Sequence, residues 1–410
     1  MTALSSVGEP AFPAPPEQDL TPARVILRAE EIASSLIDLQ AETERRHQYA
    51  PDTHEQFTRA GFYRILVPRR FGGYEFGAET FIQVGMALAR GCPSTAWMYV
   101  FGAAHALPVA TLFGERAQDE LFRAGDFVCP AVIGPAGTAE RADGGWVLSG
   151  TWRYCSGAPY ATHFLGHTLV SQGGGPPAPM LFIMPRGQWR IEDDWGDQLG
   201  LRGSGSQSIT VTGEFVPDHF TLGTHMSLAA VTDETPGHLL HDNPEYGGGQ
   251  LSFMQLELGA LAVGMAKGAL DAYAELMRNR ITVFLPFVPR VADPDYQFCY
   301  GEALGMISAA EAALMNAVQQ WHDACAAGPA SFTKKRELQL AMISREAVRL
   351  CWRAVEGQLF PTAGSSSARH GQRIERVWRD MSMLHSHAGL AVFLGSLANR
   401  ELAKAEFGVE

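Results

Sequence analysis

The sequence predicts an α+β protein of several domains: a helical N-terminal domain, a central antiparallel β domain and a C-terminal four-helix bundle. Three observations support this fold class. The chain has 410 residues, which is more than one ordinary hydrophobic core contains. Apolar residues recur at helical spacing towards both ends of the sequence. Between them lie short β-branched runs that are separated by turn residues.

The N-terminal part divides into a leader and a helical domain. Residues 1–22 are rich in proline and acidic side chains. They contain neither the basic start nor the apolar stretch of a secretion signal, so we expect a disordered leader. Over 23–125 we expect helices, because Ala33, Leu36 and Ile37 recur near the 3.6-residue period.

The central part, 126–232, has the pattern of an antiparallel β barrel or sandwich. Runs such as Leu181-Phe182-Ile183-Met184 and Ile209-Thr210-Val211 are short and rich in β-branched or aromatic residues. Turn sequences such as Asp143-Gly144-Gly145 separate them.

The C-terminal part, 233–410, returns to the helical period. Leu258, Leu261, Met265 and Ala269 fall on one helix face. Breaks at 287–294, 326–329 and 361–371 divide the segment into long helices. Long helices joined by short connections predict an up-and-down four-helix bundle.

Composition excludes several classes of function. Hydrophobic residues make up 46% and charged residues 19%, with a formal net charge of -12 and no run of lysines or arginines. A nucleic-acid partner and an anionic membrane surface both need clustered cations, so we expect neither. No window reaches the about 18 uncharged apolar residues that a membrane span requires.

The six cysteines indicate a reducing compartment. They are widely spaced and form no CxxC pair, so we expect no metal site and no redox dithiol. Six reduced thiols are typical of a cytoplasmic protein. The cysteines are Cys92, Cys129, Cys155, Cys299, Cys325 and Cys351.

The common nucleotide-binding motifs are absent from the sequence. Gly203-Ser204-Gly205 lacks the third glycine of a dinucleotide-binding turn and precedes a predicted strand. There is also no GxSxG elbow, HExxH helix or GK[ST] loop. A redox function therefore needs a flavin bound on a different fold.

Three stretches of the sequence indicate such a flavin-binding fold. They are Gly145–Gly157 (GWVLSGTWRYCSG), Gly200–Ser206 (GLRGSGS) and Arg376–Asp380 (RVWRD). In this order and spacing the chain resembles the acyl-CoA dehydrogenase superfamily from about residue 25 onwards. The first two stretches are similar to its two-component (group D) flavin-dependent monooxygenase branch, which includes 4-hydroxyphenylacetate 3-hydroxylase oxygenase components.

The first two stretches carry candidate flavin ligands. A reduced isoalloxazine ring needs an aromatic wall and a hydrogen-bond partner at N5, and Trp152 and Ser156 can supply them. The alternative is a core tryptophan and a turn serine. Arg202 and Ser204 lie in a glycine-containing loop whose backbone N–H groups can approach an anion. The alternative for Arg202 is a solvated hairpin arginine.

The resemblance implies further cofactor residues in the bundle. Arg280 falls where the family has its flavin-phosphate arginine. Gly364 and Ser365 fall in the loop that, in the family, reaches the flavin of the neighbouring subunit. We therefore expect a homo-oligomer, a tetramer, with flavins at its subunit interfaces.

The carboxylate base of the dehydrogenases is missing. By the resemblance, most relatives carry it at the place of Ala388 and a minority at the place of Met254. A dehydrogenase needs this base to remove a proton next to a thioester. Glu257, one turn after Met254, is the alternative for a displaced base.

Imidazoles lie near these vacant positions. His387 directly precedes Ala388, and His105 lies eight residues after Trp97. In the oxygenase branch a similar Trp–His pair faces flavin and substrate, so we expect Trp97 to bind substrate and His105 and His387 to act as acid or base. Ser156 is expected to protect the oxygenated flavin. The alternative for each histidine is a buried core residue.

These residues predict the oxygenase component of a two-component flavin monooxygenase. A separate NAD(P)H:flavin reductase supplies reduced FMN or FAD, which reacts with O2 to a C4a-hydroperoxyflavin and hydroxylates a small phenol- or indole-like substrate. Three alternatives remain open: an N- or S-oxygenase, an acyl-CoA dehydrogenase or oxidase with a displaced base, and a non-enzymatic protein that binds flavin or a metabolite.

Overall fold

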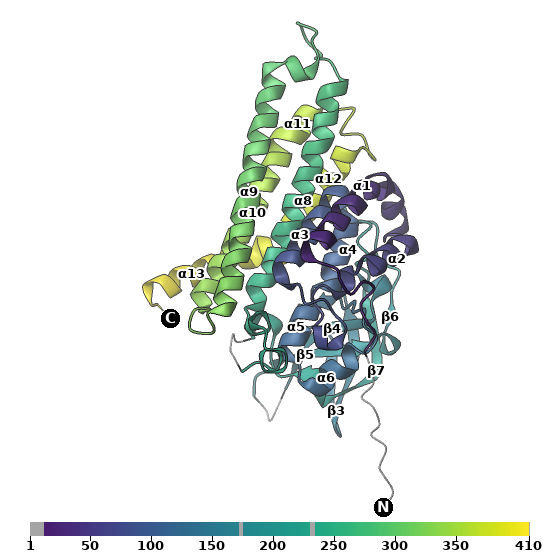
Figure 1. Cartoon of the computed structure of the whole chain (residues 1–410), viewed down its shortest axis with the longest axis vertical. Coiled ribbons are helices and arrows are strands. Elements are labelled where there is room, and N and C mark those ends of the chain that lie inside the picture. Colours follow the sequence, from purple (N-terminus) through teal and green to yellow (C-terminus); the bar gives the residue numbers. More distant parts are fainter. Residues whose placement is uncertain (1–11, 172–174, 230–233, 410) are drawn as a thin grey trace, which may run out of the picture.

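The computed structural model describes residues 12–171, 175–229 and 234–409. Its elements follow the predicted order of helices, β strands and helices (Figure 1). In Figure 1 the long helices of the C-terminal part lie side by side above the β domain, and the N-terminal helices lie beside them.

Six helices form the N-terminal domain. They are α1 (Pro22–Arg46), α2 (Pro51–Ala60), α3 (Gly77–Gly91), α4 (Pro93–Ala103), α5 (Ala106–Leu112) and α6 (Glu115–Leu121). Helix α1 begins where Thr21 accepts a hydrogen bond from the N–H of Arg24 and Pro22 takes the first helical position. Its buried face includes Ala33 and Leu36, which confirms the predicted periodicity.

The predicted leader differs from the structure in its second half. Residues 1–11 lie outside the described residues. Beyond them, Arg64 Nη1 donates to the carbonyl oxygens of Pro13 (2.8 Å) and Ala14 (2.9 Å), and Leu20 is buried. A buried guanidinium needs acceptors, and these backbone carbonyls provide them, so residues 13–20 lie against the helical domain.

Two four-stranded sheets form the β domain. The strand order of the first sheet is β1 (Ala131–Val132), β4 (His163–Val170), β5 (Ala178–Pro185) and β8 (Thr221–Leu222). The strand order of the second sheet is β2 (Thr138–Ala142), β3 (Gly145–Trp152), β7 (Ile209–Pro217) and β6 (Arg190–Ile191). Every pairing is antiparallel except the two-residue contact of β1 with β4. The predicted antiparallel β domain is confirmed.

The C-terminal bundle is built around one buried helix. Its long helices are α8 (Gln250–Asn279), α9 (Pro294–Ala326), α10 (Lys334–Ala354) and α12 (Arg373–His385), accompanied by α7 (Pro236–His241), α11 (Phe360–Ala363) and α13 (Ala398–Phe407). Helix α8 packs against α3, α9, α10 and α12. A Cβ atom at Gly264 would lie 2.3 Å from the backbone oxygen of Met86, so glycine allows α8 and α3 to approach closely. The second and third breaks lie close to the predicted positions, whereas the first begins after Asn279, seven residues before the predicted start at 287.

Two properties of the whole chain bear on its environment. The six cysteines form no disulfide, and all but Cys299 are buried. In the described ranges, no single helix combines the length and apolar composition of a membrane span. By those two criteria α12 and the segment Gly389–Phe407 pass only as a pair, with a 43° bend between them.

Candidate active site

Trp97 and Ser156 lie together although they come from different domains. Helix α4 carries Trp97, which is buried, and Ser156 lies in the loop after β3. The indole Nε1 donates a hydrogen bond to Ser156 Oγ over 2.9 Å. Ser156 Oγ is also 2.8 Å from Ser206 Oγ, which is 2.7 Å from Ser204 Oγ. One indole N–H and three hydroxyls thus form a hydrogen-bonded chain.

The Gly200–Ser206 loop is held against α12. A Cβ atom at Gly200 would lie 2.1 Å from the backbone oxygen of Arg379, so only glycine fits there. The N–H of Leu201 donates to Asp380 Oδ1 over 2.5 Å. Residues of the third stretch, far away in the sequence, therefore determine where this loop lies.

The same loop is bound to the segment that carries Ser156. Gly205 has φ +56°, a conformation that favours glycine. Its carbonyl oxygen accepts hydrogen bonds from the N–H groups of Gly157 (3.0 Å) and Ala158 (3.2 Å). The three stretches identified in the sequence therefore contact one another in the order first, second, third.

The arginines of the third stretch are paired with acidic residues outside it. Glu44 of α1 binds Arg376 (3.0 Å) and Arg379 (2.9 Å), and Arg379 also binds Glu375 (2.6 Å). Burial raises the pKa of Asp380 to about 7, although the N–H of Leu201 and the charge of Arg379 act in the opposite direction. These side chains position the loop and make no contact with Ser156 in the residues that the structure describes.

His387 follows α12 and faces the edge of Trp97. The two ring centroids are 5.9 Å apart, with 65° between the ring planes. The N–H of Gly389 donates to His387 Nδ1 over 3.2 Å, so the neutral ring carries its hydrogen on Nε2. The side chain is accessible to solvent, yet the protein atoms around it lower its pKa through desolvation. His387 is therefore a neutral N–H donor near pH 7.

His105 lies at the start of α5, eight residues after Trp97, in a different environment. Phe101 lies between them and packs on Trp97, with ring centroids 4.8 Å apart. His105 is 4% exposed, and its Nδ1 donates to the carbonyl oxygen of Phe101 over 3.0 Å. Burial lowers the pKa of His105 to about 4. The structure thus brings Trp97 and His387 together and shows His105 with backbone partners, as in the alternative of a core histidine.

Trp152 lies between the two sheets. It is fully buried, its Nε1 donates to the carbonyl oxygen of His167 (2.9 Å), and its ring meets Phe164 and Phe182 of the opposite sheet edge to face. The prediction that Trp152 forms a flavin wall does not fit this placement, because the enclosed ring has no free face. The alternative of a core tryptophan agrees with the structure.

Tyr154 has the properties that were expected of Trp152. It lies two residues before Ser156, is 65% exposed and has φ +62°. Its ring touches only Trp195 among the ring contacts of the described residues, with centroids 5.6 Å apart. An exposed aromatic ring beside Ser156 is available to a planar ligand.

Arg202 borders a polar depression on the outer side of its loop. Its Nε donates to the carbonyl oxygen of Gln198 (2.6 Å), and its guanidinium lies 3.7 Å from Glu44. The depression has a volume of about 400 Å³, and His47, Asp197, His370 and Arg376 are among its lining residues. The structure does not bring Arg202 to Ser156. Ser204 is buried, and its hydroxyl supports Ser206.

Arg280 lies beside the loop that contains Gly364 and Ser365. Its Nη1 donates to the hydroxyls of Ser366 and Ser367, each over 2.9 Å. Gly364 has φ +91°, and Ser365 and Ser366 are exposed. Arg280 follows the end of α8 that lies away from the β domain (Figure 1). One chain therefore carries two separate groups of predicted cofactor residues, one at Ser156 and one at Arg280.

Family models match both helical parts of the chain. Residues 27–122 match the acyl-CoA dehydrogenase N-terminal domain, and residues 256–392 match the acyl-CoA dehydrogenase C-terminal domain. Together the two matches span more than half of the chain. The chain belongs to the acyl-CoA dehydrogenase family.

The relatives within this family are oxygenases by name. The chain is 29% identical to the flavin-dependent monooxygenase, oxygenase subunit HsaA, of Rhodococcus jostii, over 88% of this chain and 92% of that protein. It is 28% identical to the FADH2-dependent resorcinol hydroxylase, oxygenase component, of a Rhizobium species, over 92% of each. The crystal structure of 3-HSA hydroxylase from Rhodococcus sp. RHA1 superposes with a TM-score of 0.86 at 26% identity, covering 94% of this chain and 97% of that one.

Both base positions of the acyl-CoA dehydrogenase family lack a carboxylate. Ala388 is exposed and Met254 packs against the core. Glu257 is 2% exposed, and burial raises its pKa well above the ordinary range. Burial therefore disfavours the charged carboxylate that a base requires.

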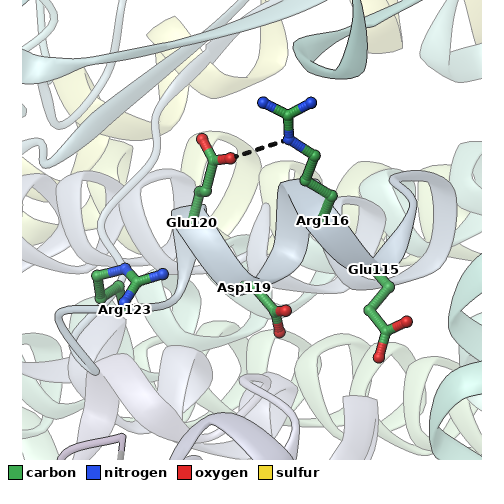
Figure 2. Close-up of a pocket in the computed structure, with 5 residues that line it drawn as sticks. All are labelled: Glu115, Arg116, Asp119, Glu120 and Arg123. Carbon is green, nitrogen blue, oxygen red and sulfur yellow. Dashed lines mark hydrogen bonds and ion pairs between the residues drawn. The ribbon is translucent and has the colours of Figure 1, made fainter. Parts of the chain in front are cut away.

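A surface hollow near α6 is unrelated to this site. It has a volume of about 310 Å³ and is lined by five charged residues of both signs. Figure 2 shows them around one short helix, with Arg116 bonded to Glu120. None of the predicted site residues lines it.

Sequence reasoning missed Ser206 and Tyr154. Ser206 follows the predicted Ser204 by two positions, and its hydroxyl is the direct partner of Ser156. Tyr154 follows Trp152 by two positions, so both fit the alternation of one strand. The two side chains differ in burial because β3 ends at Trp152. The alternation of residues in the sequence does not show where the strand ends.

Proposed function

We propose that this chain is the oxygenase component of a two-component flavin-dependent monooxygenase that hydroxylates a small aromatic substrate. The observation that carries the proposal is the contact of His387 with Trp97, which is itself bonded to Ser156. This imidazole donor directly precedes Ala388, the position at which the resemblance predicts the carboxylate base of the dehydrogenases. The names of the relatives support the same chemistry.

The residues around Ser156 fit the ring of a reduced flavin. Ser156 Oγ accepts from Trp97 and still has a hydrogen to share with Ser206 or a ligand. Tyr154 offers an exposed aromatic ring two residues away. The bound flavin would supply the activation of O2, and the buried hydroxyls and Trp97 limit the water around it.

The residues around Arg280 fit a phosphate group. A guanidinium with two serine hydroxyls 2.9 Å away gives several donors to one anion. Because this group and Ser156 lie in separate parts of the chain, a second subunit would complete each flavin site. FMN and FAD both carry such a phosphate.

His387 would act as a hydrogen-bond donor. Its Nδ1 is occupied by the N–H of Gly389, and Nε2 carries the hydrogen. Through Nε2–H it can hold the oxygen of a phenolic substrate by a hydrogen bond. Trp97 then forms an aromatic wall beside the substrate.

Exposed apolar side chains support an oligomer. The connection between α8 and α9, directly after Arg280, exposes Val283, Phe284, Leu285 and Phe287 by 64–84%. Such a patch is typical of a subunit interface. We propose a homotetramer, and light scattering of the purified protein tests this state. We also propose that a separate reductase supplies the reduced flavin. Free thiols and a supply of NAD(P)H fit a cytoplasmic location.

The test uses purified protein, chemically reduced FMN or FAD, isotopically labelled O2 and a panel of phenols and indoles. We expect a hydroxylated product that contains one labelled oxygen atom, and a strong loss of product in His387→Ala. Flavin reoxidation that yields only hydrogen peroxide with every substrate would contradict the proposal. Tight retention of oxidised FAD together with oxidation of an acyl thioester would identify a dehydrogenase instead.

A further inference from the structure

His167 and His225 are neighbouring imidazoles that lie outside the site described above. His167 belongs to β4 and is fully buried. His225 directly precedes the short segment Met226–Leu228, which lies in the connection from the β domain to the bundle. The two ring centroids are 4.3 Å apart, with 33° between the ring planes. This histidine pair therefore joins the connection to the first sheet.

The hydrogen bonds of His167 determine where its ring hydrogen lies. The backbone N–H of Met226 can only donate, and it lies 3.1 Å from Nε2, so Nε2 accepts and carries no hydrogen. The neutral ring then has its hydrogen on Nδ1, which donates to the carbonyl oxygen of Val132 in β1 over 3.0 Å. Both ring nitrogens of His167 are thus occupied when the ring is neutral.

His225 is occupied in the same way with the opposite tautomer. The N–H of Ser227 donates to its Nδ1 over 3.3 Å. The hydrogen of the neutral ring is therefore on Nε2, which donates to the carbonyl oxygen of Ile133 over 2.9 Å. Together the four ring nitrogens connect residues 225–227 with residues 132–133. A hydrogen added to Nε2 of His167 would face the N–H of Met226, and two donors cannot bond.

The surroundings of the pair favour neutral rings. Burial lowers the pKa of His167 to about 4, and the neighbouring His225 and His105 act in the same direction. In the part of the chain that the structure describes, no carboxylate forms an ion pair with either ring of the pair. Helix α8, which packs against Met226–Leu228, has one buried carboxyl group, Glu257, and burial raises its pKa. The protonated form of Glu257 is therefore favoured.

We propose that the histidine pair is an acid-sensitive contact that holds residues 225–228 on the first sheet and releases them when His167 takes up a proton. Release removes the bond from Met226 and frees a segment that packs against α8. It therefore loosens the junction between the β domain and the bundle. The contact involves neither flavin nor substrate, so this inference goes beyond the proposed function.

Proton uptake makes the release depend on pH. An exposed imidazole has a pKa of about 6.5, whereas His167 in the closed contact has a pKa of about 4. Between these values the open state binds more protons than the closed state. The equilibrium constant for opening should therefore rise about tenfold for each unit by which the pH falls. Above about pH 6.5 it should not depend on pH.

The experiment is hydrogen–deuterium exchange of the full chain at several pH values, read by mass spectrometry with fragmentation to single residues. The amide of Met226 reports opening of the contact. The amide of Leu165, which donates to Pro130 in the same sheet over 3.0 Å, reports global unfolding. Corrected for the intrinsic exchange rate, protection of Met226 should fall about tenfold per pH unit below about pH 6.5, and protection of Leu165 should fall less. Equal changes at both amides would overturn the inference.

Two variants separate titration of His167 from a purely structural role. His167→Asn retains a donor for Val132 but cannot titrate, so Met226 should be less protected at every pH and its protection should no longer depend on pH. Persistence of the tenfold dependence in this variant would overturn the inference. His225→Gln retains a donor for Ile133, removes the acceptor of Ser227 and guards against misfolding of His167→Asn. It should reduce the protection of Ser227 and keep the pH dependence at Met226, and loss of that dependence would also count against the inference.

His163 provides a matched control on the same strand. Burial lowers its pKa to about 4 as well. Its Nδ1 lies 3.0 Å from Thr162 Oγ1 and its ring stacks on Phe127, and the described residues show no bond from it to residues 225–228. In His163→Asn the protection of Met226 should keep its pH dependence. Loss of the dependence in this variant would show that any buried histidine of β4 produces it, which contradicts a specific role of His167.

Discussion

Trp97 of α4 and Ser156 of the β domain are joined by a hydrogen bond of 2.9 Å between Nε1 and Oγ. The bond crosses a domain boundary and connects the predicted substrate wall to the predicted cofactor contact. Ser206 binds the same hydroxyl from a second loop. The orientation of Ser156 therefore depends on helix packing as well as on its own loop.

Ser156→Ala should lower both the stability of the folded protein and the fraction of flavin oxidation that yields hydroxylated product. It leaves the buried N–H of Trp97 without a partner, which costs about 1–3 kcal/mol. It also removes the hydroxyl offered to the flavin, so more hydrogen peroxide should form per molecule of product. Thermal unfolding and peroxide assays measure the two effects. Ser204→Ala is the control. It removes a buried hydroxyl from the same hydrogen-bonded series of serines, and we expect the normal ratio of product to hydrogen peroxide. Equal uncoupling in both variants would contradict a direct role for Ser156.

Buried histidines should make the protein less stable in mild acid. Burial lowers the pKa of His105 and of the fully buried His167 to about 4, whereas the unfolded value is about 6.5. Between these values the unfolded chain binds more protons, so stability falls as pH decreases from 6.5 towards 4. Each histidine contributes about 1.4 kcal/mol per pH unit. Urea unfolding at several pH values should show a shallower slope in His105→Asn, and an unchanged slope would refute the assignment.

Trp152 and Tyr154 should respond to substitution in opposite ways. Trp152→Phe leaves a cavity between the sheets and removes one of two hydrogen bonds to the carbonyl oxygen of His167, which still accepts from the N–H of Ala136. We expect a cost of roughly 1–3 kcal/mol, with little effect on flavin affinity. Tyr154→Ala should weaken binding of reduced flavin at nearly constant stability. Flavin titration and thermal unfolding of both variants test this. A reversed pattern would restore Trp152 as the flavin wall.

Arg280→Gln should weaken binding of reduced FMN by about tenfold or more, since charge-assisted bonds to a phosphate are strong. Binding of reduced riboflavin, which has no phosphate, should not change. Arg278→Gln is the control, because Arg278 is an exposed arginine two residues earlier, in the last turn of the same helix. If Arg280→Gln affected both flavins equally, Arg280 would have a structural role and not a phosphate-binding one.

The order of the domains was predictable from the sequence, because the spacing of apolar residues along a helix or strand shows which of its faces is buried. The breaks after Asn279 and Ala326 follow from proline- and glycine-containing segments that cannot continue a helix. The second half of the leader was not predictable in this way. Its backbone carbonyls serve as acceptors for Arg64, and no local pattern in the sequence records that distant contact.

Parts of the site were predictable only through the family resemblance. It pointed to Trp97, Ser156 and His387, which the structure brings together. It did not separate Trp152 from Tyr154, because the positive φ of Tyr154 turns the chain after β3. Nor did it separate His105 from His387, because burial and backbone partners depend on tertiary packing.

The contacts of Gly200 and Leu201 with Arg379 and Asp380 have a consequence for biosynthesis. The Gly200–Ser206 loop leaves the ribosome long before the helix that supports it. While the chain is being translated, Ser206 has no fixed position from which to hold Ser156. The nascent polypeptide should therefore gain affinity for flavin only after Asp380 has emerged from the exit tunnel.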